Sequence, residues 1–375
     1  MLGHVQKIFW LSIKELRSIR ADPIVMVLIV YTFSIAIYTV ATGAKLEVEH
    51  ASVGIVDNDQ SQLSRQIQAA IAEPYFKPPR ELSITEVDAA MDLNRFVFVV
   101  ELPAGLEADV LAGRQPRVQI GVDATAMAHA GNGAIYLQSI INAEVLRFVG
   151  RGAASTEQPI DLVVRSRFNP NLKSIWFNSV MQIINNITIL SVILTGAAMI
   201  REREHGTVEH LLVMPVTSTD IMFSKIAANG LVILLAAMIS LNVVVEGFLE
   251  VPVAGSLMLF LAGAALYQFS VTALGLLIAT FTTSMPQFGL VALPVLVTMN
   301  LLSGSTTPIE TMPEWLQQAM LVSPSTHFVG FAQAVLYRGA GLSIVWPQIL
   351  SLAAIGAVFF GVSLMRFRKA IGSMH

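Results

Sequence analysis

The residues best suited to a specific task cluster within Arg201–Pro215. This segment reads Arg-Glu-Arg-Glu-His-Gly-Thr-Val-Glu-His-Leu-Leu-Val-Met-Pro. It follows the uncharged run Phe177–Ile200, and another uncharged run begins after Lys225. Glu204-His205 and Glu209-His210 could be taken for metal ligands, but a spacing of five places the two imidazoles on different faces of a helix. Alternating charges are typical of a docking surface, and we therefore favour a protein-binding segment over a metal site. An ordinary amphipathic loop is the alternative.

The rest of the sequence lacks the common catalytic and nucleotide-binding motifs. It has no Gly-x-x-x-x-Gly-Lys-Ser/Thr segment, so the chain does not bind ATP through a P-loop. It also has neither Gly-x-Ser-x-Gly nor His-Glu-x-x-His. The absence of cysteine excludes disulfides, thiolate metal sites and cysteine nucleophiles. A membrane enzyme is therefore the least favoured function.

The composition is that of a membrane protein. Of the 375 residues, 54% are hydrophobic and 13% are charged, and the mean hydropathy is +0.66. The formal net charge of −3 gives no reason to expect a nucleic-acid partner. Because a charge buried in hydrocarbon costs several kcal/mol, Arg201–Pro215 must form a loop between two spans.

Apolar runs predict six transmembrane helices, with both termini on the same side of the membrane. The runs are Ile24–Thr42, Phe177–Ile200, Ile226–Val245, Ser256–Thr280, Phe288–Leu302 and Ile344–Leu364. The first could also be a signal peptide, but its length and the charged segment before it favour an uncleaved span. The fifth is short and contains Pro294. It spans the membrane only if Pro286 opens the helix and Ser284 caps it.

None of the six runs contains Asp, Glu, Lys, Arg or His. Proton- and sodium-coupled carriers usually place ionisable side chains near the middle of the membrane. We therefore infer that the chain is not an ion-coupled transporter and takes its energy from elsewhere. Polar residues do occur in the spans, among them Asn185, Asn186 and Asn300. They indicate either a mildly polar pathway or hydrogen bonds between helices, which is the commoner role of such residues.

Residues 44–176 differ from the rest and predict an α/β domain inserted between the first two spans. Strands are expected at Ser52–Val56, Phe96–Glu101, Val118–Val122 and Asp161–Arg167. Helices are expected at Ser61–Ala72, with Ser61 as the cap, at Thr85–Asp92 and at Gly133–Val149. The alternation of the two kinds of element is the basis for the predicted fold class.

The basic residues of the short segments indicate the orientation of the chain. Segment 1–22 and loop 201–225, together with the C-terminal end, carry nearly all of them, whereas the short loops on the other side hold only Arg338. Both termini and loop 201–225 are therefore expected in the cytoplasm, and the α/β domain outside it. Segment 1–22 predicts a basic amphipathic helix on the membrane surface. Segment 304–343 predicts two proline-initiated extracytoplasmic helices.

The charged loop also carries helix-boundary signals. Gly206 can end the helix of the second span, Thr207 can cap a short helix over Val208–Met214, and Pro215 ends that helix. A residue of Thr217–Thr219 can then cap the third span. A short rigid helix along the membrane is suited to transmit a push from a soluble partner that supplies energy.

This loop resembles the signature loop of ABC-2-type permeases, the membrane halves of ABC exporters. The resemblance rests on Arg-Glu-x-Glu-x-Gly-Thr-x-Glu-x-Leu-Leu-x-x-Pro at Arg201–Pro215 and covers nearly the whole chain. It includes Val-Asp-Asn-Asp-Gln-Ser at 56–61, Leu-Pro-Ala-Gly at 102–105, Pro-Ser-Thr-His-Phe at 324–328 and Tyr-Arg-Gly at 337–339. The combination is similar to bacterial inner-membrane permeases that work beside a periplasmic adaptor of the membrane-fusion type.

The resemblance implies a multi-pass exporter subunit of the inner membrane, with two six-span halves and two cytoplasmic ABC ATPase domains. The second half could be a copy of this chain or a relative. No cofactor is implied for this chain, because ATP is used by the partner subunit. The residues implied in coupling to the ATPase are Arg201, Glu202, Glu204, Gly206, Thr207, Glu209 and Pro215. The turn Thr282–Gln287 would be a second, smaller contact. Asn185, Asn186 and Asn300 would line the pathway, since spans two and five usually face it in this family.

A membrane receptor or scaffold is the alternative function. In that case the domain at 44–176 would bind a ligand and the cytoplasmic loop would signal. The sequence speaks weakly against this, because it contains no soluble output domain on the cytoplasmic side. No motif indicates the substrate of a transporter.

Overall fold

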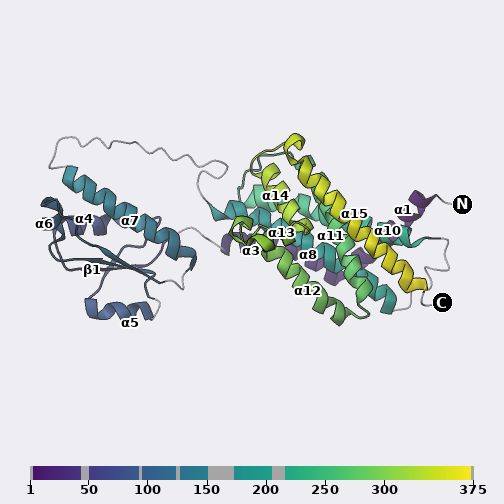
Figure 1. The fold of residues 1–375 in the computed structure, drawn as a ribbon, viewed down its shortest axis with the longest axis horizontal. Coiled ribbons are helices and arrows are strands. Elements are labelled where there is room, and N and C mark those ends of the chain that lie inside the picture. Colours follow the sequence, from purple (N-terminus) through teal and green to yellow (C-terminus); the bar gives the residue numbers. More distant parts are fainter. Residues whose placement is uncertain are drawn as a thin grey trace. The chain divides into compact units, whose positions relative to one another are not determined.

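The computed structural model describes residues 3–43, 50–92, 95–123, 127–150, 173–204 and 216–372. The chain forms two units, one of residues 1–43 and 175–375 and the other of residues 44–174 (Figure 1). We call them the helical unit and the α/β unit, and each is described by itself.

The helical unit begins with an amphipathic helix that leads into a broken span. Helix α1 (His4–Ala21) ends at Asp22, whose carboxylate caps α2 (Pro23–Phe33) by accepting two backbone N–H groups of its first turn at 3.1 and 3.2 Å. The chain breaks at Ser34 and continues as α3 (Ile35–Gly43). Together α2 and α3 have the length and hydropathy of a membrane span. The first predicted span is therefore present, but as two helices.

Further helices complete the unit. They are α8 (Ser174–Glu204), α10 (Ser218–Ser240) with its π-helical continuation η2 (Leu241–Phe248), α11 (Leu257–Phe281), α12 (Met285–Leu301), the 3₁₀ turn η3 (Ile309–Thr311), α13 (Glu314–Met320), α14 (Pro324–Leu336) and α15 (Leu342–Gly372). Helix α10 begins with a capping box, as the threonines before it predict. The Thr217 hydroxyl accepts the Asp220 N–H, and the Asp220 carboxylate accepts the Thr217 N–H.

Five of the six predicted spans are matched by full-length apolar helices within the described ranges: α2–α3, α8, α10–η2, α11 and α15. The predicted fifth span corresponds to α12, which has 17 residues. At 1.5 Å per residue it reaches about 25 Å, less than a ~30 Å hydrocarbon core. Helix α12 continues through Pro294, and Ser284 precedes it without forming a side-chain cap. Helices α13 and α14 meet at 86° and give a sixth full span only if counted as one broken crossing.

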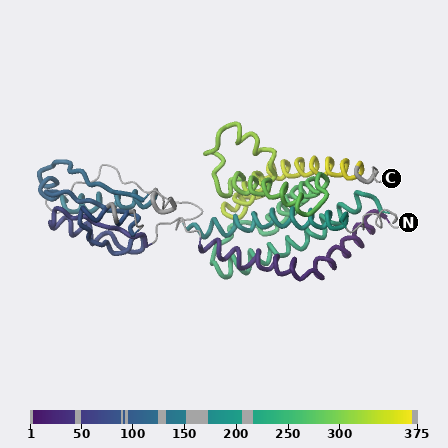
Figure 2. The backbone as a smooth tube through the Cα atoms, turned by 90° about the horizontal axis from the view of Figure 1, so that it is seen from below, coloured from purple at the N-terminus to yellow at the C-terminus, as the bar shows by residue number. Residues whose placement is uncertain are grey.

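Helix α8 forms the centre of the helical unit. Within its apolar part 83% of the residues are buried, against 17% for α15, so α8 is enclosed by its neighbours while α15 borders the surroundings. Helix α1 packs along α10, and α15 packs along α11 and α14. Helix α1 and the C-terminal end of α15 lie at the same end of this unit (Figure 2). At that end the Arg368 guanidinium donates to the Thr219 hydroxyl at 3.3 Å.

The α/β unit contains a four-stranded sheet in the order β2-β1-β3-β4. The strands are β1 (Val53–Asp57), β2 (Arg80–Glu81), β3 (Phe98–Leu102) and β4 (Gln119–Val122). Strand β1 pairs in parallel with β2 and β3, and β3 pairs antiparallel with β4. The strand predicted at Asp161–Arg167 lies outside the described residues.

Helices cover both faces of this sheet. They are α4 (Gln62–Ala70), η1 (Ile84–Glu86), α5 (Val87–Asp92), α6 (Leu106–Leu111) and α7 (Met127–Gly150). Helices α4 and α7 lie on one face and α5 on the other (Figure 1). The larger core forms where Ile67 of α4 and Leu137 of α7 bury against Ile55 and Phe98 of the sheet. Ser61 caps α4 by accepting the Ser64 N–H at 3.1 Å.

Candidate functional site

The last turn of α8 carries the part of the charged segment that the structure describes. Arg201, Glu202 and Glu204 of the predicted coupling set lie in it. The other predicted coupling residues, Gly206, Thr207, Glu209 and Pro215, lie outside the described residues, as does the expected short helix between them. The site is therefore built from the four residues 201–204 and from what they contact.

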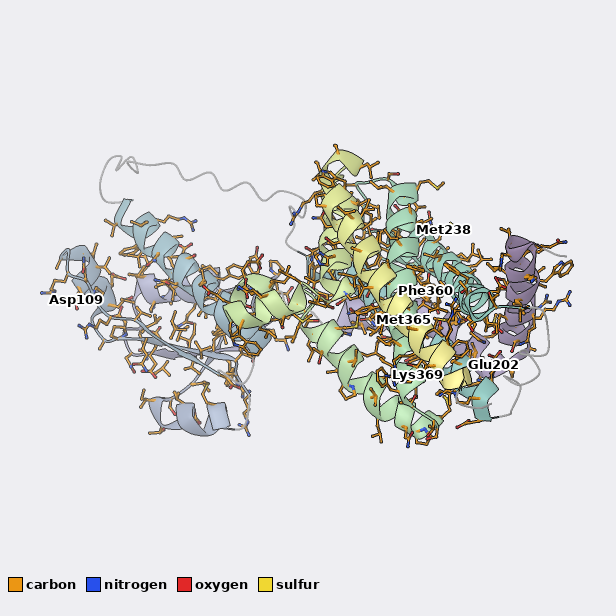
Figure 3. The ribbon with its side chains drawn as sticks, turned by 45° about the vertical axis from the view of Figure 1, so that its right-hand side comes forward. Asp109, Glu202, Met238, Phe360, Met365 and Lys369 are labelled. Atoms are coloured by element: carbon orange, nitrogen blue, oxygen red, sulfur yellow. The ribbon has the colours of Figure 1, made fainter. Side chains whose placement is uncertain are left out.

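A buried lysine lies at the centre of these contacts. The Lys225 ammonium is 2.9 Å from a Glu202 carboxylate oxygen and 3.2 Å from a Glu15 carboxylate oxygen, and its side chain is 1% exposed. Lys14 approaches the same two carboxylates at 3.2 and 3.5 Å. We call Lys14, Glu15, Glu202 and Lys225 the charge cluster. Figure 3 labels Glu202, which lies at the same end of the helical unit as Lys369.

The charge cluster joins three helices. Lys14 and Glu15 belong to α1, Glu202 to α8 and Lys225 to α10. A charge removed from water is tolerated when it is paired and hydrogen-bonded, and here each ammonium lies beside two carboxylates. Partial burial opposes the charged form of Lys14, but the attraction of Glu202 and Glu15 outweighs it and raises the pKa of Lys14. The four charges therefore sum to zero and hold α1 against the bundle.

Three further contacts hold α1 at its start, its middle and its end. The His4 imidazole is 2.8 Å from a carboxylate oxygen of Asp220 on α10. The Ser12 hydroxyl donates to a carbonyl of α10 at 3.3 Å. Arg201 pairs with Asp22, the residue between α1 and α2, at 3.4 Å. Contacts with α8 and α10 therefore hold α1 along its whole length.

Arg203 and Glu204 bind the turn between α11 and α12. The Arg203 guanidinium donates to the carbonyl oxygens of Ala279 and Thr282 at 3.3 and 2.9 Å. These carbonyls belong to the C-terminal end of α11, which lacks intrahelical donors and carries partial negative charge. The Glu204 carboxylate accepts the backbone N–H of Met285, the first residue of α12, at 3.1 Å. The end of α8 thus caps one helix with a cation and the next with an anion.

The sequence indicated that residues 201–204 belong to a functional segment, but it did not indicate which residues they contact. Glu15 is the only acidic residue within the basic helix α1, and Lys225 stands alone at the start of an apolar run. Each was a signal that could have been read as half of an ion pair. Their sequence separation of 210 residues gave no means of pairing them.

The amides predicted to line a pathway occupy different environments. Asn186 is buried, and its side chain donates to the Thr32 carbonyl at 2.7 Å and accepts from Gln182 at 3.0 Å. Thr32 lies two residues before the break in the first span, where backbone carbonyls lose their intrahelical donors. Asn186 therefore supports that break. Asn185 on α8 and Asn300 in the last turn of α12 are half-buried.

Helices α8 and α12 also meet at a glycine. A Cβ atom added to Gly196 would lie 2.0 Å from the ring of Phe288, closer than any side chain permits. Phe288 itself is buried. The aromatic ring can therefore rest against the α8 backbone only because residue 196 has no side chain. This contact and the Glu204–Met285 hydrogen bond place the first turns of α12 on the last turns of α8.

No group of three or more His, Asp or Glu residues that could hold a metal ion occurs in the part of the chain that the structure describes. The two Glu-His pairs of the charged loop are not in that part. What the described site can do is mechanical. It links the departure point of the loop to α1, α10, α11 and α12 through ion pairs and helix caps.

Comparisons with known proteins identify the family. Residues 23–365 match the family described as ABC-2 family transporter protein. The chain is 50% identical over 373 residues to the inner membrane transport permease YhhJ of Escherichia coli (strain K12), with the whole of both chains covered. It is 29% identical over 367 residues to a protein of the same organism named "Probable multidrug ABC transporter permease YbhR", with 96% of this chain and 97% of the relative covered. The chain therefore belongs to the ABC-2 family of membrane transport permeases.

Proposed function

We propose that this permease forms one half of the translocation pathway of an ATP-driven exporter. A separate cytoplasmic ABC ATPase would engage loop 201–215, and the chain itself would bind no nucleotide. The observation that carries the proposal is the set of contacts made by residues 202–204. Glu202 binds Lys225 and Lys14, Arg203 caps α11, and Glu204 caps α12. A loop that leaves from so firmly attached a turn can transmit force to four helices.

The geometry suggests how a push on the loop would reach the pathway. Helix α12 is short and attached at its start through Glu204, and it rests on α8 at Gly196. A movement of the last turn of α8 would therefore tilt α12 against α8. Asn185 on α8 and Asn300 on α12 are the pathway-lining candidates, while the amide of Asn186 is occupied by Thr32. The turn Thr282–Gln287 would make the second contact with the ATPase.

Charge reversal tests the coupling role. Glu204→Lys and Glu209→Lys should leave the ATPase bound while hydrolysis no longer drives export. Glu204→Gln separates the helix-capping role of Glu204 from the role of its charge. Glutamine keeps an oxygen that can accept the Met285 N–H but carries no charge. Glu310→Lys is the matched control, since Glu310 is exposed in η3, away from the described coupling contacts. Export that stays coupled to hydrolysis in both reversal variants would refute the coupling role of this loop.

The α/β unit is proposed to lie outside the cytoplasm, where it could meet a membrane-fusion adaptor. The absence of native cysteine makes a clean test possible. Leu111→Cys on α6 and Arg17→Cys on α1 both replace exposed residues. A membrane-impermeant maleimide should label Leu111→Cys in sealed right-side-out membranes and Arg17→Cys only after the membrane is opened. The reverse pattern would invert the proposed orientation.

The second half of the exporter is proposed to be a copy of this chain or a relative that packs near α12. The described outer face of α12 exposes Leu290, Leu293 and Val297, which fits either lipid or an apolar partner helix. Disulfide formation between copies carrying Leu293→Cys would support a homodimer at this face. A cross-link only to a different permease would support a heterodimer.

A further inference from the structure

A cavity of about 430 Å³ lies beside the charge cluster, between α1, α2, α8 and α10. Its lining separates into two ends. The charged end contains Lys14, Glu15, Asp22, Arg201 and Glu202. The apolar end contains Val25 and Leu28 of α2 with Ile193 and Leu194 of α8. A cavity with one charged and one apolar end fits an amphiphile better than a wholly polar or wholly apolar ligand.

The residues that line the cavity extend along α8 and α2 from the charged end to the apolar end. From Arg201 to Ile193 along α8 is about 12 Å, and from Asp22 to Leu28 along α2 is about 9 Å, at 1.5 Å per residue. The charged end lies where α1 joins the first span, and the apolar end lies within the predicted hydrocarbon region. The first span has only 22% of its apolar part buried, so lipid can reach α2 from the side.

The charges at the polar end balance. Two basic and three acidic side chains line it, and the buried Lys225 touches two of the acids. An anionic lipid would add an uncompensated negative charge beside Glu15, Asp22 and Glu202. A headgroup that carries a phosphate and an N–H-bearing ammonium adds no net charge and complements both signs. Lys14 and Arg201 suit the phosphate, and the Asp22 carboxylate suits the ammonium.

We propose that this cavity binds one membrane phospholipid with a phosphate–ammonium headgroup, of the phosphatidylethanolamine class. Its acyl chain lies against Leu28 and Ile193, and its headgroup lies beside the charge cluster. The lipid then fills the space between α1 and α8 and supports the same attachment that the ion pairs provide. The inference does not depend on the proposed exporter function, because lipid binding is measured without an ATPase or a substrate.

The first experiment uses the unaltered protein. Delipidated permease in mild detergent is offered equal amounts of phosphatidylethanolamine and phosphatidylglycerol with the same acyl chains, and bound lipid is counted by intact mass spectrometry. One phosphatidylethanolamine per chain should be retained, with a preference of about tenfold over phosphatidylglycerol. Equal or greater retention of phosphatidylglycerol, or retention of no lipid, would overturn the proposal.

Matched variants then locate the site. Leu28→Trp fills the apolar end, and Val30→Trp adds the same bulk to an exposed position of α2 that does not line the cavity. Lys14→Gln removes a charge from the cavity, and Arg17→Gln removes one from an exposed position of α1 outside it. Leu28→Trp and Lys14→Gln should each lose most of the bound lipid, and the two controls should keep it. Loss in the controls as well, or retention in all four, would show general lipid coating and not a site.

Discussion

Removing the central ammonium of the charge cluster should detach α1. Lys225→Met keeps a buried apolar stem but takes away the charge between Glu15 and Glu202, whose side chains are 12% and 13% exposed. Breaking a buried ion pair by removing one partner costs about 3–5 kcal/mol, because the other charge stays out of water. Since Lys14 remains within 3.5 Å of both carboxylates, we expect the lower end, about 3 kcal/mol.

Two measurements detect this loss of stability. Unfolding of the detergent-purified permease gives the change in stability, and amide hydrogen exchange shows whether α1 loses protection before the rest of the helical unit. The double variant Lys225→Met/Glu202→Gln should be less destabilised than the sum of the single variants, because it removes one of the charges left unpaired. Arg17→Met is the control, since Arg17 is an exposed cation of the same helix.

Two results together would contradict this expectation. The free energy of unfolding of Lys225→Met would lie within about 0.5 kcal/mol of that of the unaltered chain, and the amide hydrogens of α1 would exchange as slowly in the variant as in the unaltered chain. In that case the apolar packing of α1 on α10 would hold the helix, and the buried charges would serve another purpose. If the double variant is destabilised by the sum of the two single effects, Lys225 and Glu202 are not coupled.

Three further substitutions test other contacts. Gly196→Val drives a side chain into the ring of Phe288; it should cost about 1–3 kcal/mol in thermal unfolding, and Phe288→Ala should restore part of the loss. Asn186→Leu leaves the Thr32 carbonyl without its 2.7 Å donor and should cost about 0.6–1.7 kcal/mol, seen as faster hydrogen exchange around the break in the first span. Asp59→Ala removes a carboxylate that accepts a backbone N–H in the first turn of α6 and should destabilise the α/β unit by about 0.5–2 kcal/mol. Burial opposes the charged form of Asp59, but its hydrogen bonds outweigh burial and lower the pKa of this carboxyl below its ordinary value. Its contribution to stability is therefore present at neutral pH and is lost as the pH falls through the lowered pKa.

Each of these expectations has its own counter-result. A Gly196→Val protein as stable as the unaltered chain would mean that α12 moves away at no cost. Unchanged hydrogen exchange around the break in Asn186→Leu would show that another group donates to the Thr32 carbonyl. If Asp59→Ala lowers the stability of the α/β unit by the same amount at pH 7 and at pH 3, the expected loss of the Asp59 contribution at low pH is wrong.

The positions of the spans followed from the sequence because uncharged runs of sufficient length have few alternatives to a membrane helix. The capping box at Thr217 was also readable, since it depends on residues three apart. The break at Ser34 was not predicted. The Ser34 hydroxyl donates to the Val30 carbonyl within the run, but the second support, the hydrogen bond from Asn186 to the Thr32 carbonyl, joins residues 154 apart. Local signals predict local structure, whereas a contact between residues so far apart has no signal in the sequence.

The candidate site was also predictable only in part. The charged segment stood out because seven titratable groups lie within ten residues directly after an uncharged run. That Arg203 caps α11 and Glu204 caps α12 could not be predicted, because both contacts depend on how α8 packs between helices distant in sequence. The shortness of α12 was foreseeable, but its attachment to the end of α8 was not.

The most direct test of coupling through Arg201–Pro215 is cross-linking to the ATPase in native membranes. A photoactivatable group is attached to Thr207→Cys, with Glu310→Cys as the control position, in the chain that otherwise lacks cysteine. Position 207 should cross-link an ABC ATPase subunit, and position 310 should not. An assembled complex that hydrolyses ATP but gives no ATPase cross-link from position 207, or gives it equally from position 310, would contradict the proposed coupling.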